Sequence, residues 1–302
     1  MDTHAKTKII VIVGPTGSGK TALAIKIATK FKGEIISADS RQVYRNLDIG
    51  TEKVTHEEMA GIQHHLIDIT DIQTVYTASD FKKDAEKIIT HITKNNKLPI
   101  IAGGTFFYID TLLKNIPTAD IPPDPELREQ LEMLPTEKLF IALQELDPKR
   151  AMDIDPHNRR RVIRALEVIE AIGQVPSRSD SDLNNLYDVL CIGIEIDREV
   201  LRTRLKMRAE HAVERGLVEE TKSVLATGVS KERLTEIGHE YAVVLEYLDG
   251  KFGDAELLQK LEEKNWQYAK RQWTWLKKME NVNWFQNDDP AIITAIENFL
   301  RR

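Results

Sequence analysis

A phosphate-binding motif lies close to the start of the chain. Its residues are Gly14, Pro15, Thr16, Gly17, Ser18, Gly19, Lys20 and Thr21. They fit the spacing G-x-x-x-x-G-K-[ST], in which glycines let backbone amides converge on phosphate oxygens. Lys20 supplies a full positive charge, and the Thr21 hydroxyl can hold Mg²⁺. The motif predicts a nucleotide-binding or diphosphate-binding loop. It does not decide whether the ligand is ATP, GTP or a diphosphate.

Asp39 is a further candidate for a chemical role. It follows the apolar run Glu34 to Ala38, which predicts a strand next to the phosphate loop. A carboxylate at that strand end can accept a proton from a group that attacks a bound phosphate ester. Two alternatives remain open: Asp39 orients Mg²⁺ through water, or it is a turn residue that satisfies local amides.

The next predicted strand, Leu98 to Ala102, ends in Gly103-Gly104-Thr105. A motor or switch NTPase usually carries an aspartate at such a strand end, and the guanine-reading N-K-x-D pattern is also absent from the sequence. These absences favour a transferase over a GTPase or a translocase. The Thr105 hydroxyl can hydrogen-bond a substrate, with a purely structural turn as the alternative.

Two basic helical patterns are candidates for contacts with nucleic acid. The first contains Arg159, Arg160, Arg161 and Arg164, and the second interleaves Lys270, Arg271, Lys277 and Lys278 with Trp266, Tyr268, Trp273 and Trp275. Cations can hold RNA phosphates, and aromatic rings can stack on unpaired bases. The alternatives are a solvated charged face for the first pattern and tryptophans that anchor the helix for the second. We expect Trp275 to be an anchor and Lys270 and Arg271 to face RNA.

The elements that must position these residues alternate between strand and helix. Strands are predicted at Lys8 to Val13, Glu34 to Ala38 and Leu98 to Ala102, and an amphipathic helix at Ser79 to Lys94. This alternation predicts an α/β fold, a P-loop parallel-sheet core with helices on both faces. Because ligands bind beyond the carboxyl ends of such strands, the three loops are expected to meet at one crevice.

A helical insertion domain is predicted at residues 116–188, between core segments 1–115 and 189–302. A hinge-like cluster of prolines marks its start, at Pro117, Pro122, Pro123 and Pro125. Asp155-Pro156 suits the start of its last helix. The run Val189 to Ile196 then returns to the sheet, and Arg198 to Lys278 is expected to be mostly helical and to cover the sheet.

Composition narrows the class of protein further. The chain has 302 residues and a net charge of −6, so binding to a polyanion requires a local basic surface. Cys191 is the only cysteine, which excludes an intramolecular disulfide and a thiolate zinc site. The start of the chain lacks a signal-peptide layout, and no apolar run approaches the roughly 20 residues that span a bilayer. We expect a cytoplasmic protein.

Taken together, the motifs resemble those of one family, the bacterial tRNA dimethylallyltransferases, also called tRNA isopentenyltransferases. Besides the phosphate loop, the blocks that carry the resemblance are Ser37 to Arg45, Leu47 to Thr51, His64 to Asp68, Gly103 to Thr105, Asp124 to Arg128, Arg161 to Val168 and Tyr268 to Trp275. They occur in the order of the family and cover nearly the whole chain.

The resemblance implies a specific reaction. A dimethylallyl group passes from dimethylallyl diphosphate to the exocyclic amine of the tRNA adenosine just 3′ of the anticodon. The phosphate loop and Mg²⁺ then hold the diphosphate, with Arg208 as a further contact, and Asp39 accepts the proton of the amine. Thr105 matches a position beside the target base. The implied partners are tRNA and the diphosphate donor. We expect the protein to be a monomer without an obligate protein partner.

Further residues match tRNA-contacting positions of the family. They are Asp39, Ser40, Arg41, Gln42, Thr105, Arg128, Arg160, Arg161, Arg164, Gly238, His239, Lys270, Arg271, Gln272 and Lys277. The chain departs from the family at Ile237 to Tyr241, where Ile-Gly-Tyr-Lys-Glu is common, and at Asp155 to Asn158. Two other functions compete: a small-molecule P-loop kinase that uses ATP, and an RNA-binding NTPase without group transfer.

Overall fold

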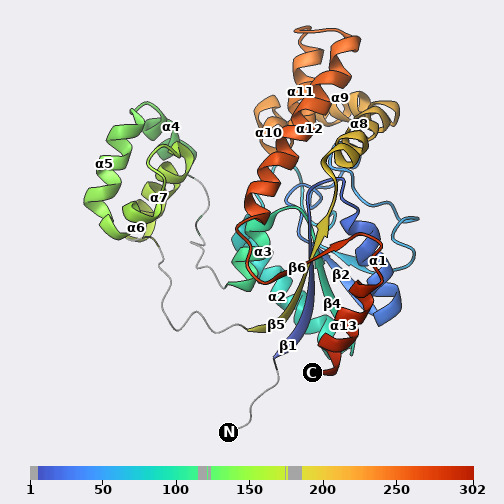
Figure 1. Cartoon of the computed structure of the whole chain (residues 1–302). Helices are drawn as coiled ribbons and strands as arrows, with labels where there is room; N and C mark the ends of the chain where they lie inside the picture. The colour runs from blue at the N-terminus through green and yellow to red at the C-terminus, as the bar shows by residue number, and fades with distance from the viewer. Residues whose placement is uncertain (1–5, 115–120, 122–123, 174, 176–185) are drawn as a thin grey trace. The chain divides into compact units, whose positions relative to one another are not determined.

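The computed structural model describes residues 6–114, 121, 124–173, 175 and 186–302. The chain divides into two compact units. The sheet unit comprises Met1–Leu113 and Asn185–Arg302, and the helical unit comprises Lys114–Asn184 (Figure 1). Three prolines of the predicted hinge, Pro117, Pro122 and Pro123, lie outside the described residues, as do the first residues of the chain.

A six-stranded parallel sheet forms the centre of the sheet unit, with strand order β3-β2-β4-β1-β5-β6. The strands are β1 Thr7–Val13, β2 Gly33–Ser37, β3 His64–His65, β4 Leu98–Ala102, β5 Tyr187–Glu195 and β6 Val282–Gln286. In the central strand, Val11 pairs with Ile101 on one side and Cys191 on the other. The predicted α/β parallel sheet is confirmed, and β3 and β6 add two edge strands that the sequence analysis did not predict.

Helices cover both faces of this sheet because the strands alternate buried residues between the two faces. Ile10 and Ile12 of β1 pack with helices α1 (Lys20–Phe31) and α13 (Ala291–Arg301). Val11 and its neighbours of β1 on the same face pack with helices α2 (Ala78–Lys94) and α3 (Phe106–Leu113) (Figure 1). The central strand is therefore buried on both sides, and the loop that follows it is held by a rigid base.

The segment after β5 is mostly helical, as predicted, but it packs differently from the prediction. It forms helices α8 Arg198–Glu214, α9 Leu217–Ala226, α10 Lys231–Ile237, α11 His239–Leu248 and α12 Asp254–Leu276. These helices lie at the carboxyl end of the strands (Figure 1), and most of their apolar residues form a separate core. That core includes Val43, Tyr44 and Leu47 from the segment after β2 and contains no strand residue. The expectation that the whole segment covers the sheet is wrong; only the end of α12, around Leu276, packs there.

The helical unit contains four described helices around its own core. They are α4 Pro125–Glu132, α5 Thr136–Leu146, α6 Pro148–Asp153 and α7 Arg159–Ile172. Leu139 and Leu143 of α5 pack against Val162 and Leu166 of α7. The last helix does not begin at Asp155-Pro156 as expected. Asn158 caps it, because its side chain accepts a hydrogen bond from the Arg161 N–H and leaves Asp155 in the preceding turn.

Within the residues that the structure describes, no helix combines the length and the hydropathy that crossing a membrane requires.

Candidate active site

The phosphate loop joins the end of β1 to the start of α1. Gly17 and Gly19 have φ angles of 76° and 95°, in the left-handed region that favours glycine. Gly19 is the N-cap of α1. The Ser18 N–H donates to the Pro15 carbonyl oxygen at 3.2 Å and closes the turn. A loop of this shape at a helix N-terminus presents amides to a bound anion.

Lys20 lies at the first position of α1, and its ammonium group folds back over the loop. Its Nζ donates to the Pro15 carbonyl oxygen at 2.8 Å. Burial lowers the pKa of Lys20 to about 7, an effect that the Asp39 carboxylate opposes and the Arg208 guanidinium reinforces. A bound phosphate would supply the counter-charge that this buried ammonium lacks.

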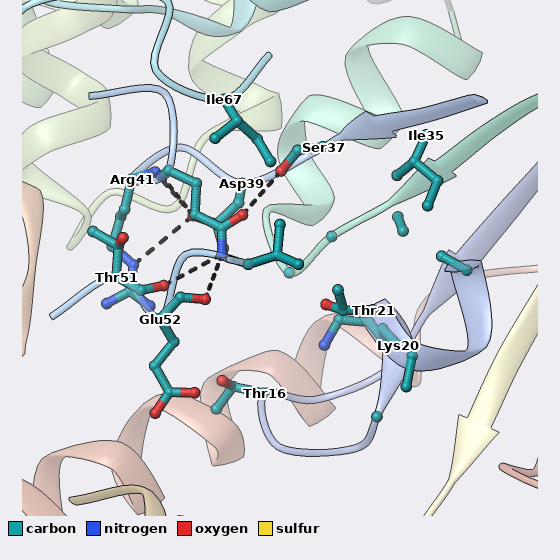
Figure 2. A pocket seen from close by; sticks show the side chains of 18 of the residues that line it. Thr16, Lys20, Thr21, Ile35, Ser37, Asp39, Arg41, Thr51, Glu52 and Ile67 are labelled. Atoms are coloured by element: carbon teal, nitrogen blue, oxygen red, sulfur yellow. Dashed lines mark hydrogen bonds and ion pairs between the residues drawn. The ribbon is translucent and has the colours of Figure 1, made fainter. Parts of the chain in front are cut away.

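A cavity of about 580 Å³ lies beside the loop, at the carboxyl ends of β1, β2 and β4. Figure 2 shows Thr16, Lys20 and Thr21 from the phosphate loop, and Asp39 and Arg41 from the loop after β2, around this one cavity. Gly103 and Gly104 from the turn after β4 complete the convergence of the three loops. Thr105 itself does not line the cavity.

One part of the cavity wall is apolar. Its apolar residues are Ala22, Ala24, Ile25, Ile35, Val54, Ile67 and Ala102. The cavity thus combines a cationic phosphate end with a hydrocarbon surface, a combination that suits a ligand carrying both charge and an apolar tail.

Asp39 is held by one of its two carboxylate oxygens. Oδ1 accepts from the backbone N–H groups of Arg41 at 2.9 Å and Gln42 at 3.4 Å. Among the described residues, every hydrogen bond to Asp39 uses Oδ1. The turn interpretation and the general-base interpretation are therefore compatible: Oδ1 orders the turn, and Oδ2 remains for a proton.

Thr105 reinforces the turn that carries Asp39. Its Oγ1 accepts from the Ser40 N–H at 3.0 Å and donates to Ser40 Oγ at 3.2 Å. Gly103 lies against the backbone of Ala38: a Cβ at this position would be 2.1 Å from the Ala38 carbonyl oxygen. The G-G-T sequence therefore lets the ends of β2 and β4 approach each other, and the Thr105 hydroxyl is occupied by Ser40.

Glu52, a site residue that the sequence did not reveal, contacts two predicted site residues, Arg208 and Gln42. Its Oε1 lies 2.6 Å from Arg208 Nε, and Arg208 also donates to the Thr16 hydroxyl. Burial raises the pKa of Glu52, and the Arg208 charge opposes that shift. Gln42 holds the backbone here, since its Nε2 donates to the Glu52 carbonyl oxygen at 3.0 Å. Arg208 thus lies in the cavity with one carboxylate partner already in place.

Four predicted tRNA-contacting residues are part of the site wall or its support. Arg41 is 7% exposed and pairs with Glu240. Gln272 is 4% exposed and bonds to the phosphate loop. His239 lies at the start of α11, with its Nε2 2.9 Å from Asn265 Oδ1, and Gly238 is the N-cap of that helix.

The basic residues at the end of α12 behave differently from the tryptophans. Lys270, Arg271 and Lys277 are exposed. Trp266 and Trp273 meet edge to face with ring centroids 5.6 Å apart, and both pack on the apolar cluster of α8. The tryptophans therefore anchor the helix, in agreement with the structural alternative, and the cations remain available at the surface.

In the helical unit, the four arginines that match tRNA-contacting positions of the family divide into two pairs. Arg160 and Arg161 are exposed. Arg128 binds the buried Glu167 carboxylate through Nε at 2.7 Å and Nη2 at 2.9 Å, and Arg164 Nη1 lies 3.3 Å from the same group. Within the described part of the helical unit, the guanidinium groups of the first pair have no carboxylate partner and remain free to grip phosphates, whereas those of the second pair are occupied by Glu167.

A magnesium ion fits this site only together with a phosphate ligand. In the described part of the chain, no group of three or more His, Cys, Asp or Glu side chains is arranged to hold a metal. Thr21 lines the cavity next to Lys20. Mg²⁺ is commonly bound by one or two protein oxygens, substrate phosphates and water, so a single hydroxyl beside a phosphate loop is a suitable donor set.

The parallel sheet with a phosphate loop after its central strand defines a P-loop-type α/β protein. A family model described as IPP transferase matches residues 42–279. The tRNA dimethylallyltransferase of Alkaliphilus metalliredigens is 39% identical over an alignment that covers 98% of this chain and 97% of that protein. The chain therefore belongs to the IPP transferase family and is an enzyme.

Solved structures agree with this membership. The tRNA isopentenylpyrophosphate transferase from Bacillus halodurans has 38% identity and a TM-score of 0.71, covering 98% of this chain and 96% of its own. A eukaryotic dimethylallyltransferase, captured acting on tRNA, has 28% identity and a TM-score of 0.79, covering 94% of this chain and 75% of its own.

Proposed function

We propose that this enzyme transfers a dimethylallyl group from dimethylallyl diphosphate to the exocyclic amine of the tRNA adenosine just 3′ of the anticodon. The observation that carries the proposal is that Lys20 and Asp39 line one cavity whose remaining wall is partly apolar. The ammonium end suits a diphosphate, and the apolar wall suits a five-carbon chain. The carboxylate suits an amine that must lose a proton.

In the proposed reaction, the adenosine amine attacks the allylic carbon that is bonded to the diphosphate oxygen. The new C–N bond forms while the C–O bond breaks, and the electron pair of that bond leaves on the diphosphate. Lys20 and the loop amides stabilise the charge that builds up there. The amine proton passes to Asp39 Oδ2, because Oδ1 is occupied by the amides of Arg41 and Gln42.

Three residues assist the donor in this scheme. Arg208 contributes a second cation to the diphosphate, from its position between Glu52 and Thr16. The Thr21 hydroxyl would hold Mg²⁺, which when bound neutralises phosphate charge on the leaving group. Because dimethylallyl diphosphate carries no nucleoside, this scheme needs no base-binding pocket next to the loop.

The exposed cations are proposed to bind the tRNA. They are Arg160 and Arg161 on α7 and Lys270, Arg271 and Lys277 on α12 and just after it. The target adenine must leave its stack to reach the Asp39 carboxylate inside the cavity. The hydrogen bonds between Ser40 and Thr105 would hold the turn that carries Asp39 while the nucleotide binds.

One assay tests the function against its rivals. Purified enzyme is incubated with unmodified tRNA, Mg²⁺ and either dimethylallyl diphosphate or ATP, and the nucleosides are analysed by mass. We expect prenylated adenosine only with the isoprenoid donor. A phosphorylated product that depends on ATP, with no prenylated adenosine, contradicts the proposal.

Variants of two aspartates sharpen this assay. Asp39→Asn keeps an oxygen acceptor for the turn but removes the base, so the transfer rate should fall by about 10²- to 10⁴-fold while tRNA still binds. Asp71→Asn, which changes an exposed carboxylate paired with Arg45, is the matched control and should leave the rate unchanged. A full transfer rate in Asp39→Asn removes Asp39 from the mechanism.

A further inference from the structure

Arg41 is a buried cation on the loop that carries Asp39. Its side chain is only 9% exposed, although an isolated charge is costly to bury. The guanidinium is held from two directions: Nη1 donates to Glu240 Oε2 at 2.6 Å, and the Tyr268 ring lies 5.3 Å from Cζ. Burial opposes the charged form, but Glu240, Tyr268 and Asp39 together outweigh it and keep the pKa of Arg41 above its usual value.

The buried Nε–H of this guanidinium has no hydrogen-bond partner among the described residues. Nε lies 4.0 Å from Asp39 Oδ1. The backbone N–H of Arg41 donates to the same oxygen at 2.9 Å. Backbone and side chain of Arg41 therefore both face Oδ1 of the proposed base.

The carboxylate that anchors Arg41 belongs to α11, and its oxygen Oε1 has no hydrogen-bond partner among the described residues. Glu240 lies in the first turn of α11, where a negative charge is favourable. Its second oxygen, Oε1, lies 3.3 Å from His239 Nε2, and that ring atom is 2.9 Å from Asn265 Oδ1 on α12. Burial lowers the pKa of His239, the Glu240 carboxylate opposes that shift, and the Arg41 charge reinforces it.

The ion pair with Glu240 keeps the Arg41 guanidinium away from a diphosphate bound in the cavity. A loose guanidinium in the cavity wall would be drawn to the phosphates, because bidentate phosphate binding is favourable for arginine. The Glu240 carboxylate prevents that movement, since breaking the buried pair would leave an uncompensated charge. The positive charge of Arg41 thus stays at the base, and Lys20 and Arg208 remain for the donor.

We infer that Arg41 is a positioning residue for the transfer reaction, locked by Glu240 so that it orients the Asp39 carboxylate through Oδ1 and directs Oδ2 toward the amine. This inference rests on the proposed function of Asp39 as the base. It gives Arg41 and Glu240 a joint role in the rate of transfer, in place of a direct contact between Arg41 and tRNA.

The test uses the full-length enzyme with dimethylallyl diphosphate and tRNA. Arg41→Met removes the cation and leaves the carbon stem, and kcat should fall by about a hundredfold because the base loses its orientation. KM for dimethylallyl diphosphate should change by less than about threefold, since the donor contacts remain. Arg41→Lys should recover part of kcat, because it restores a cation beside the base.

A double variant separates positioning from stability. Arg41→Met alone leaves the Glu240 carboxylate buried and unpaired, which lowers the melting temperature. In Arg41→Met/Glu240→Gln the buried charge is gone, so the melting temperature should recover while kcat stays low. Recovery of kcat together with stability overturns the inference and reduces the pair to a structural role.

Two controls complete the design. Arg45→Met removes an exposed arginine of the same loop, which pairs with Asp71 at the surface, and should retain wild-type kcat. The wild-type enzyme must form prenylated adenosine in the same assay. If it forms none, the proposed function fails; if it does and Arg41→Met matches its kcat, only the present inference fails.

Discussion

The side chain of Gln272 connects the phosphate loop at Thr16 to the turn after β4. Its Oε1 accepts from the Thr16 N–H at 2.7 Å, and its Nε2 donates to the Gly104 carbonyl oxygen at 3.2 Å. The residue is buried on α12, 256 positions away from Thr16 in the chain. One amide group therefore sets the distance between the proposed donor site and the turn beside the proposed base.

Replacing this amide should weaken the donor site more than the fold. Gln272→Ala leaves the Thr16 N–H and the Gly104 carbonyl unpaired, at about 1 kcal/mol or more for each lost bond. KM for dimethylallyl diphosphate should rise about tenfold, and steady-state kinetics on tRNA measures it. Gln259→Ala, on the exposed side of the same helix, is the control; equal kinetics for the two variants contradict the connecting role of Gln272.

The pH dependence of donor binding should report on Lys20. Its pKa is near 7 because of burial, and a diphosphate binds the ammonium form. Below pH 7 the group is already charged, so affinity is independent of its titration. Above pH 7 binding must take up a proton, and affinity should fall by up to about tenfold per pH unit until the pKa of the complex is reached.

Calorimetry in buffers of different ionisation heat measures this proton uptake directly. Lys20→Arg keeps a permanent charge at the position, so its uptake above pH 7 should be smaller by up to one proton. Titration of the diphosphate itself is common to both proteins and cancels in the comparison. Identical uptake by the two proteins assigns the proton to another group.

The sequence predicted the centre of the fold because its signals there are local. Apolar runs followed by Gly14, Asp39 and Gly103 place three loops at the ends of parallel strands, and the structure brings these loops to one cavity. β3 has only two residues, and β6 has three exposed and two half-buried positions, with Asn283 and Trp284 among the exposed ones. Neither carries a periodic pattern long enough to predict a strand.

The support of the site depends on contacts that no local pattern encodes. Arg41 meets Glu240 across 199 positions of the chain, and Gln272 reaches Thr16 across 256. The sequence does not reveal these partners, and the family resemblance assigned Arg41 and Gln272 to tRNA contacts. A usable signal did exist for Arg164, because Glu167 follows it at the i+3 spacing that favours an ion pair on one helix.

The salt dependence of tRNA binding tests the proposed role of the exposed arginines on α7. Arg160→Ala/Arg161→Ala removes two free cations, and the slope of log affinity against log salt should decrease by about 1.5. Arg301→Ala/Arg302→Ala removes the same charge from the exposed end of α13, near the beginning of β1, and should leave the slope unchanged. An unchanged slope in the first variant returns α7 to a solvated charged face.

Glu167 should be the residue on which the helical unit depends most. Its carboxylate is 2% exposed and accepts from the Asp124 N–H at 3.0 Å as well as from Arg128 and Arg164. The hydrogen bonds and charges of these partners outweigh burial and lower its pKa. This carboxylate therefore stabilises the folded unit above the unfolded pKa of about 4.3, and the stabilisation is lost as pH falls through the lower folded value.

At neutral pH, Glu167→Gln removes the charge but not the shape of the side chain. The local unfolding free energy of α7 should fall by about 2 kcal/mol, because two arginines and a backbone amide keep only a neutral partner. Hydrogen exchange of the α7 amides in the full-length enzyme measures this change. Glu170→Gln, an exposed carboxylate on the same helix, should leave α7 protection as it is; equal exchange in both variants contradicts the role of Glu167.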